Sequence, residues 1–319
     1  MLLCSRRVKE LAREEGFSAC GLSEAAPVSA ERAGEIRAWL AAGHNGSMDY
    51  LARNVDKRLD PRLLLDGART IVSLAVNYSP TDGTEGESPH LARYACGTDY
   101  HDVVKAMIRR LLVRLGLSEG VDTRAFVDTA PIDEKYWAQQ GGLGWRGRNC
   151  QLIIPGAGSF FFLGELLTTH PADCYDVPAV SRCGTCRACL DACPTGALCG
   201  DGTMDARRCL SYLTIECRDP LPEGTGAKMG GCFYGCDRCG EACPWNRRFA
   251  RRTAVEELLP RPALLVMGRE DWQRLTQEDY TQLFRKSAVK RAKFTGITRN
   301  IAAWAEASAE TEERGEGKD

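Results

Sequence analysis

The residues most able to do chemistry in this chain are cysteines arranged in two short runs. The first run reads C-x2-C-x2-C-x3-C-P over residues 183–194, and the second reads C-x2-C-x3-C-P over residues 236–244. This spacing is typical of thiolates that hold two [4Fe–4S] clusters, with the last cysteine of each run bound to the cluster of the other run. We assign cluster 1 to Cys183, Cys186, Cys189 and Cys243. Cluster 2 takes Cys193, Cys236 and Cys239, and it still needs a fourth ligand.

The sequence offers two candidates for this fourth ligand of cluster 2. A regular second run would carry a cysteine at position 233, but Phe233 stands there and Cys232 is one residue out of register. Cys209 lies in a separate segment between the two runs. We favour Cys209, because a loop can bring an isolated thiolate to a cluster, whereas Cys232 would need a distorted spacing.

Zinc binding and disulfide bonds are the other interpretations of these cysteines. Structural zinc would use one C-x2-C pair from each of two knuckles and would leave the remaining cysteines and the Cys-Pro endings unexplained. Disulfides require an oxidising compartment, and the chain starts without a signal peptide and has no apolar run that could span a membrane. We therefore expect a cytoplasmic protein in which the eight other cysteines are mostly buried small side chains.

About 170 residues of alternating helical and strand-like patterns precede the cysteine runs. Apolar stretches that predict strands lie at residues 17–22, 70–78, 124–128, 150–154 and 160–168. Amphipathic helices are predicted at residues 5–15 and 30–42, and another ends near residue 115. This alternation predicts an α/β (α+β) domain over residues 1–172, followed by the two-cluster module over residues 173–248.

A glycine-rich segment, Gly141–Asn149, follows a predicted helix in the α/β domain. It matches neither G-x-G-x-x-G after a strand nor G-x4-G-K-[ST], so a nucleotide site is weakly supported. Its glycines could let the backbone approach a bulky ligand closely, or they could form a tight turn between a helix and a strand. Both interpretations stay open.

Charge is unevenly distributed along the chain. The net charge is −1, yet residues 247–299 contain 13 Lys/Arg against 6 Asp/Glu. We predict a short basic helical segment over residues 249–319, with Ile297, Ile301 and Trp304 on one apolar face and a disordered tail from Glu310.

The basic residues near the end of the chain suggest a polyanionic partner. Between Asp279 and Glu306 there are six basic residues and no acidic one. A solvated helix face normally mixes both signs, so this segregation favours a surface that faces phosphates. Lys290, Arg291 and Lys293 are the predicted contacts. The alternative is a basic surface without a partner.

Sequence blocks spread over residues 5–305 resemble the epoxyqueuosine reductase family. The blocks are Asn45–Asn54, Arg93–His101, Val127–Pro131, Gly142–Asn149, Ser211–Glu216, Tyr234–Cys239 and Cys243–Asn246, together with the eight cluster cysteines. Members of that family are cobalamin-dependent oxidoreductases that finish the queuosine base of the tRNA anticodon by reducing an epoxide. The resemblance implies a cobalamin-binding domain distantly similar to nitroreductases, followed by a bacterial ferredoxin-like domain with two [4Fe–4S] clusters.

The resemblance also implies roles for single residues. The proton-donor aspartate of the family falls on Asp128, a cysteine near cobalt falls on Cys96, and Arg53 and Ser211 fall among the cobalamin contacts. It supports Cys209 as the remote ligand of cluster 2. The implied partners are the anticodon arm of tRNA and an external electron donor of the flavodoxin or ferredoxin type, and the chain is expected to act as a monomer.

Other interpretations of the same features stay open at this point. Asp128 also suits an N-cap for a helix that starts at Pro131, because Asp before a proline-led first turn is a common helix start. The alternative functions are a corrinoid reductase that acts on a small molecule, as reductive dehalogenases do, and a plain two-cluster electron carrier or cluster-assembly protein. Corrin absorption bands beside those of the clusters would exclude the electron carrier.

Overall fold

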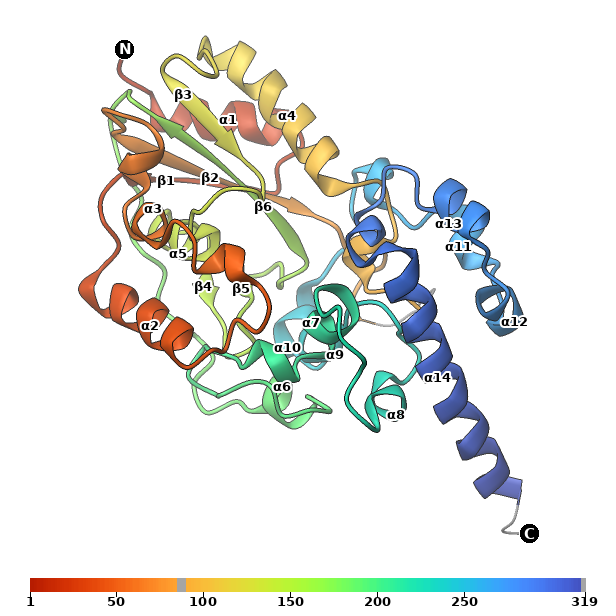
Figure 1. Cartoon of the computed structure of the whole chain (residues 1–319). Helices are drawn as coiled ribbons and strands as arrows, with labels where there is room; N and C mark the ends of the chain where they lie inside the picture. Colours follow the sequence, from red (N-terminus) through yellow and green to blue (C-terminus); the bar gives the residue numbers. More distant parts are fainter. Residues whose placement is uncertain (85–89, 317–319) are drawn as a thin grey trace.

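A four-stranded sheet forms the centre of the N-terminal part of the molecule (Figure 1). The computed structural model describes residues 1–84 and 90–316, and beyond residue 307 it describes only the backbone of the last helix. The strands are β1 (Ala19–Glu24), β2 (Thr70–Asn77), β3 (Thr123–Phe126) and β6 (Phe161–Thr168), in the order β1-β2-β6-β3. Neighbouring strands are antiparallel. The strands predicted at residues 70–78, 124–128 and 160–168 are thus confirmed to within two residues.

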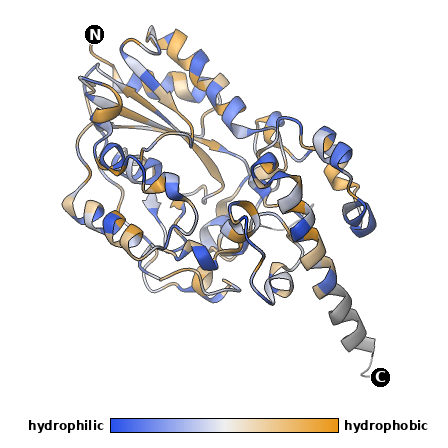
Figure 2. Ribbon diagram, in the orientation of Figure 1, coloured by the Kyte–Doolittle hydropathy of each residue, from blue (hydrophilic) through white to orange (hydrophobic). Residues whose placement is uncertain are grey.

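Helices cover both faces of this sheet, which is why β2 is almost entirely apolar (Figure 2). On one face, α1 (Ser5–Glu14) and α4 (Tyr100–Leu115) pack against Val72 and Leu74. On the other face, α2 (Ala30–Ala41), α3 (Val55–Leu59) and α5 (Glu134–Gln140) pack around Ile71. The alternation along β2 follows the two-residue period of a strand.

The glycine-rich segment 141–149 packs against the protein's own backbone. It leads into a small hairpin of β4 (Trp145–Arg146) and β5 (Leu152–Ile153). A Cβ atom on Gly144 would lie 2.1 Å from the carbonyl oxygen of Ile153, and one on Gly21 would lie 1.9 Å from that of Gly141. Both contacts exclude any side chain, so these glycines are explained by tight packing of backbone on backbone.

The two cysteine runs fold as a pair of similar turns. Each run contains a four-residue helix, α6 (Ala188–Asp191) in the first and α9 (Arg238–Glu241) in the second, and these two helices contact each other. Between them lie α7 (Leu210–Ile215) and α8 (Thr225–Met229), and α10 (Pro244–Phe249) follows the second run. This pairing brings the ends of the two runs together, as exchange of their last cysteines requires.

The C-terminal segment packs closely on the rest of the chain. It comprises α11 (Pro262–Leu265), α12 (Arg269–Gln273), α13 (Gln277–Leu283) and α14 (Lys293–Glu316). The predicted apolar face of Ile297, Ile301 and Trp304 is confirmed as buried. It belongs to a hydrophobic cluster that also contains Leu91 and Phe233, so one core crosses the predicted boundaries near residues 172 and 248.

The predicted disordered tail needs a correction. α14 continues to Glu316, because the sequence from Ala302 is rich in Ala and Glu, which favour helices. Residues 317–319 of that predicted tail lie outside the described residues. Within the described part of the chain, no helix is both long and apolar enough to cross a membrane.

Candidate functional site

The structure gathers the predicted ligands of cluster 1. The pKa of the Cys189 thiol is raised first by burial and then by the neighbouring thiols of Cys243, Cys183 and Cys186. The indole Nε1 of Trp145 donates a hydrogen bond to Cys183 Sγ at 3.3 Å. Such donors to cluster sulfurs tune the potential of iron–sulfur centres. These four thiols therefore form one group.

The predicted ligands of cluster 2 form a second group, which includes Cys209. Burial raises the pKa of the Cys239 thiol, and the thiols of Cys236 and Cys209 raise it further. The thiol of Cys193 likewise adds to the raised pKa of Cys209. The Ala197 N–H donates to Cys193 Sγ at 3.3 Å. Cys209 thus lies beside the three other members of its predicted set.

Cys232, the rejected candidate, has a different environment. It lies near Cys236, but its thiol donates to the carbonyl oxygen of Tyr234 at 3.1 Å. None of the sixteen cysteines, all of which lie in the described part of the chain, forms a disulfide bond. Among the described residues, no three His, Cys, Asp or Glu side chains converge closely enough to hold a single metal ion.

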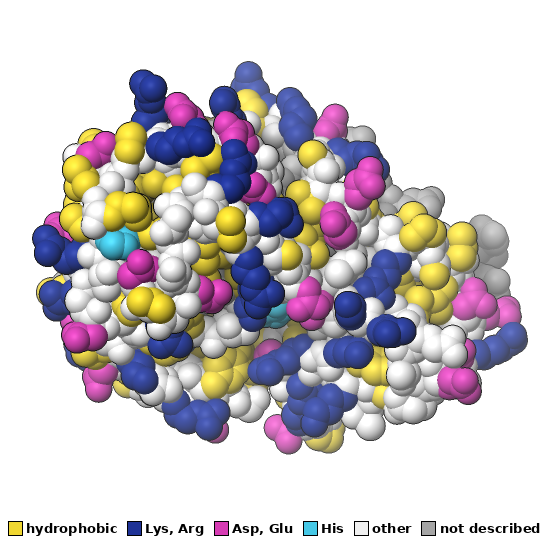
Figure 3. Space-filling view, turned by 90° about the horizontal axis from the view of Figure 1, so that it is seen from above, with side chains coloured by type: hydrophobic (Ala, Val, Ile, Leu, Met, Phe, Trp, Pro, Cys, Tyr) yellow, Lys and Arg dark blue, Asp and Glu magenta, His cyan; other side chains and the backbone are white. Residues whose placement is uncertain are grey.

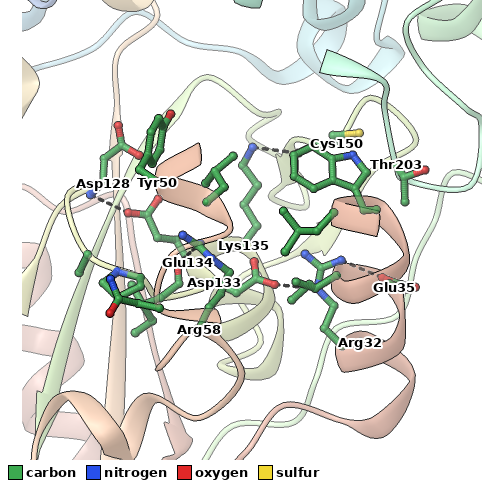
Figure 4. A pocket seen from close by; sticks show the side chains of 18 of the residues that line it. Arg32, Glu35, Tyr50, Arg58, Asp128, Asp133, Glu134, Lys135, Cys150 and Thr203 are labelled. Carbon is green, nitrogen blue, oxygen red and sulfur yellow. Dashed lines mark hydrogen bonds and ion pairs between the residues drawn. The ribbon is translucent and has the colours of Figure 1, made fainter. Parts of the chain in front are cut away.

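An open cavity of about 670 Å³ lies on the α5 side of the sheet (Figure 4). One wall is α2, and another is the segment from Asp128 to Lys135. A third wall combines Arg146 and Cys150 with the loop 202–204. The cavity therefore lies between the predicted α/β domain and the cysteine module, and its volume is typical of a ligand or cofactor pocket.

Cys150 marks the point where the cavity meets the second cysteine group. Its Sγ donates to the carbonyl oxygen of Gly202 at 3.3 Å, and its own carbonyl accepts from Lys135 Nζ at 2.9 Å. Burial raises the pKa of its thiol to about 12, and the thiols of Cys199 and Cys209 contribute to that rise. Cys209 and Cys239 of the second group therefore lie near Cys150 in the cavity wall.

Asp128 lies in the cavity wall, on the loop that follows β3. Its side chain is 59% exposed, and its backbone has φ = 56°, a left-handed conformation that is uncommon for residues other than glycine, asparagine and aspartate. The hydroxyl of Tyr100 donates a hydrogen bond to Asp128 Oδ2, and His101 Nε2 lies 3.8 Å from the same oxygen. The carboxyl group thus faces open space with two polar side chains behind it.

The alternative interpretation of Asp128 as a helix cap is wrong. α5 begins at Glu134, and Asp133 occupies its N-cap position. Instead of the Asp128 side chain accepting from a helix N–H, the Asp128 backbone N–H donates to Glu134 Oε1 at 2.7 Å (Figure 4). The helix start therefore holds the loop of Asp128, and Asp128 does not stabilise the helix start.

The structure separates the four predicted cobalamin contacts. Asp128 and Arg53 both line the cavity. Cys96 is 1% exposed, its thiol donates to the carbonyl oxygen of Ala92 at 3.4 Å, and burial raises its pKa. Ser211 lies in the first turn of α7, two residues after Cys209, and, like Cys96, is not among the described residues that line the cavity.

The predicted RNA contacts also differ from one another. Lys290 and Lys293 are exposed. Arg291 forms a two-pronged ion pair with Glu216, at 2.7 and 2.8 Å, and its guanidinium lies 5.5 Å from the ring centroid of Tyr50 in the cavity wall. The pairing with Glu216 raises the pKa of Arg291. Arg291 therefore joins the C-terminal segment to the cavity wall.

Arg299, another basic residue of this segment, uses its guanidinium for hydrogen bonds within the protein. Arg299 donates to the carbonyl oxygens of Leu213, Cys217 and Asp219 at 2.9, 3.0 and 2.6 Å. On the face of the molecule shown in Figure 3, basic and acidic side chains are interspersed. A count of basic residues in the sequence thus overstates the charge that is free to meet a partner.

Sequence reasoning missed three residues around Asp128. Tyr100 lies within the block 93–101, one of the blocks that carry the family resemblance, but the resemblance assigned it no chemical role. Glu134 follows Asp128 by six residues, and the only sequence signal for its role is that it is an acidic residue shortly after the turn that contains Pro131. Tyr50 lies within the block 45–54, which also carries the resemblance without assigning Tyr50 a chemical role, and its position at the cavity depends on the packing of the loop between α2 and α3.

Comparisons with known proteins agree with this arrangement. Residues 58–129 match the family model described as "Epoxyqueuosine reductase QueG, DUF1730", and residues 182–246 match the "4Fe-4S double cluster binding domain". An epoxyqueuosine reductase of Leadbetterella byssophila is 44% identical over 93% of this chain and 97% of its own length. That of Escherichia coli is 35% identical over 93% of this chain and 79% of its own length.

Solved structures show the same relationship. An epoxyqueuosine reductase crystallised with an epoxyqueuosine-modified stem loop of tRNA-Tyr is 28% identical and superposes with a TM-score of 0.84, covering 95% of this chain and 80% of that one. A Bacillus subtilis epoxyqueuosine reductase, described with its catalytic aspartate loop swung out of the active site, is 27% identical with a TM-score of 0.82, covering 96% and 83%. The chain belongs to the epoxyqueuosine reductase family.

Proposed function

We propose that this protein is an oxidoreductase that reduces the epoxide of epoxyqueuosine in a tRNA anticodon to give queuosine, the last step in making that base. Its cofactors are cobalamin and two [4Fe–4S] clusters. The observation that carries the proposal is the cavity, which has the exposed carboxyl of Asp128 on one wall and Cys150, within reach of the second cysteine group, on another. An acid and an electron source on opposite sides of one cavity suit a reductive ring opening.

The two groups of thiols are the proposed cluster ligands. Cluster 1 is held by Cys183, Cys186, Cys189 and Cys243, and cluster 2 by Cys193, Cys209, Cys236 and Cys239. When bound, the clusters supply electrons one at a time from an external donor of the flavodoxin or ferredoxin type. The grouping of thiols in the folded chain supports this assignment, because Cys209 lies beside three members of its set and Cys232 beside one.

The cavity has properties that fit a large cofactor such as cobalamin. It is open, it is lined by polar and apolar side chains, and it is bordered by backbone at Gly202. The Nε of Arg58, which lines it, is buried and has no hydrogen-bond partner among the described residues. A buried guanidinium nitrogen without a partner is costly, so a ligand with acceptor groups would stabilise this wall.

Arg53, Arg58 and Tyr50 are the residues that we propose to hold the cofactor in this cavity, with Asp128 facing it. Cys96 and Ser211 are left out, because neither lines the cavity. When bound, reduced cobalamin supplies a strong nucleophile for a strained epoxide carbon. The cavity walls would position the cofactor.

Asp128 is the proposed general acid. Its carboxyl holds a proton that it gives to the oxygen released by ring opening, because a bare alkoxide is a poor species to leave in a cavity. The carboxylate that remains accepts a hydrogen bond from Tyr100. The loop conformation of Asp128, held by Glu134, keeps the carboxyl aimed into open space.

The anticodon arm of a tRNA is the proposed partner of the basic C-terminal segment. Lys290 and Lys293 are exposed and free to meet phosphates, and Arg291 connects this segment to Tyr50 at the cavity. A stem loop held on these lysines would therefore bring its loop toward the cavity. A relative of similar fold crystallised with a tRNA stem loop supports a tRNA as the partner.

The test is conversion of an epoxyqueuosine-containing anticodon stem loop by anaerobically purified protein. We expect about eight irons per chain, corrin absorption bands after cobalamin is added, and conversion to queuosine only when a reductant is present. Protein that holds both cofactors and reduces a small organohalide, but leaves the RNA unchanged, would contradict the proposal and favour the dehalogenase-like alternative. Protein that binds no corrin would favour the plain electron carrier.

A further inference from the structure

Two carboxyl groups lie beneath the loop of Asp128 and have no role in the proposed reaction so far. Glu134 begins α5, lines the cavity and accepts the Asp128 N–H at Oε1. Glu165 lies in the middle of β6 and is 0% exposed. Neither carboxyl oxygen of Glu165 has a hydrogen-bond partner among the described residues.

The register of the sheet places Glu165 on the side of Asp128 and Glu134. Glu165 is directly opposite Phe126 of β3 and Ser73 of β2, so the three side chains share one face of the sheet. Phe126 belongs to the hydrophobic cluster that contains Trp137 of α5, which identifies this face as the one that α5 covers. Asp128 follows Phe126 by two residues. The three carboxyl groups thus lie on the same side of one sheet.

The surroundings of both glutamates favour their neutral forms. Burial, and then the charge of Asp128, raises the pKa of Glu134 to about 8, although Lys135 opposes the rise. Burial, followed by Glu134, Asp128 and Asp133, raises the pKa of Glu165 well above its ordinary value. A carboxylate buried without any partner is strongly disfavoured, so Glu165 is a carboxylic acid at neutral pH.

The proposed reaction needs more protons than Asp128 alone can hold. Converting an epoxide to an alkene with release of its oxygen as water consumes two electrons and two protons. Asp128 gives one proton to the opening oxygen and becomes a carboxylate. A second proton must then reach the departing oxygen.

We propose, resting on the function proposed above, that Glu134 stores this second proton and passes it to Asp128, with Glu165 as a neutral carboxyl behind it. Asp128 gives up its first proton, takes the proton of Glu134, and gives that one to the oxygen, which leaves as water. Glu134 ends as a carboxylate and regains a proton from solvent after the product leaves, because it lines the cavity. Glu165 keeps its own proton, so the charged Glu134 does not face a further buried anion.

Glu134 touches Asp128 rather than the substrate, so its test must separate proton storage from positioning. Glu134→Gln keeps an acceptor for the Asp128 N–H but cannot supply a carboxyl proton. Glu134→Ala removes both functions. We expect single-turnover conversion of the RNA to fall on the order of 10²-fold in Glu134→Gln and at least as far in Glu134→Ala. In the unmodified enzyme the rate should fall as pH rises through about 8, as Glu134 loses its proton, and Glu134→Gln should lack this limb.

Infrared spectra provide a readout that does not depend on turnover. In protein loaded with clusters, a protonated-carboxyl band should disappear with rising pH, with a midpoint near 8, and should be missing in Glu134→Gln. A second such band should persist across that range and be lost in Glu165→Gln. Asp122→Asn is the control, because Asp122 lies beside His170 just before β3, at the opposite end of that strand from Asp128; it should change neither band.

The outcomes distinguish this proposal from the function on which it rests. If the unmodified protein does not convert the RNA, the proposed function fails. If it converts the RNA and Asp128→Asn abolishes conversion, but Glu134→Gln retains full rate and the alkaline limb, proton storage is overturned and Glu134 only positions the loop. A shift of the alkaline limb to lower pH in Glu165→Gln would show that Glu165 is charged, which would also overturn the proposal.

Discussion

The cysteine module and the cavity differ in how their functional residues are placed along the chain. Seven of the eight proposed cluster ligands lie in two runs of fewer than fifteen residues each, and only Cys209 is remote. The cavity instead combines α2, Tyr50, the loop of Asp128 and the loop 202–204, which are separated by up to about 170 residues. Functional residues that lie in one local turn leave a recognisable spacing in the sequence. Functional residues that come from distant segments packed around a cavity leave no such spacing.

The largest effect is expected from Cys209, the one proposed cluster ligand that lies outside the two cysteine runs. Cys209→Ala should cost about four of the eight irons, because a [4Fe–4S] cluster with three protein thiolates is poorly held. Cys232→Ala is the matched control, since its thiol donates to a backbone carbonyl, and it should keep nearly all its iron. Iron content of anaerobically prepared protein measures both variants. The opposite pattern would make Cys232 the ligand.

The proposed chemistry of the cavity is tested most directly by replacing Asp128. Asp128→Asn should lower turnover on the order of 10²-fold or more, because the amide cannot donate the proton that the leaving oxygen needs. Its thermal stability and iron content should stay unchanged, since the residue caps no helix and its side chain is exposed. Turnover and melting temperature are measured on the same preparations. A variant with full activity would end the assignment.

A smaller effect, on RNA binding, is expected from the exposed lysines of the C-terminal segment. Replacing Lys290 and Lys293 with Ala should weaken binding of the anticodon stem loop and flatten the salt dependence by about one unit per lost phosphate contact. Arg291→Ala should mainly lower thermal stability, because it breaks the ion pair with Glu216 and the contact with Tyr50. Binding measured at several salt concentrations separates these effects. An unchanged slope in the double variant would place the RNA elsewhere.

The smallest effect concerns stability and its dependence on pH. Below the ordinary pKa of 4.5 a carboxyl group at Glu165 is protonated in both states. Above 4.5 the unfolded chain releases the proton while the folded chain retains it, so stability falls as pH rises, by about 1.4 kcal/mol per unit. Glu165→Gln should remove this contribution. Denaturant midpoints between pH 5 and 7 should therefore fall less steeply in the variant than in the unmodified protein.

The sequence by itself determined the features that depend on short stretches of chain. The apolar run at residues 70–78 predicted a central strand because both faces of β2 are covered. The two C-x2-C runs predicted both thiol groups because a cluster fixes the spacing of ligands in a turn. The block around Asp128 predicted its place at a site through family resemblance, whereas the residues alone suggested a helix cap.

The tertiary structure decided what depends on contacts between distant segments. Arg291 and Lys290 are alike in sequence, but only the fold shows that Arg291 pairs with Glu216 and covers Tyr50. Cys96 was expected near the cofactor, and packing of residues 91–96 against the C-terminal helices buries it instead. Glu165 would pass for an ordinary strand residue, yet cross-strand register and the cover of α5 leave its carboxyl without a hydrogen-bond partner in the described part of the chain. Burial and pairing are properties of three-dimensional neighbours, and no local pattern in the sequence encodes them.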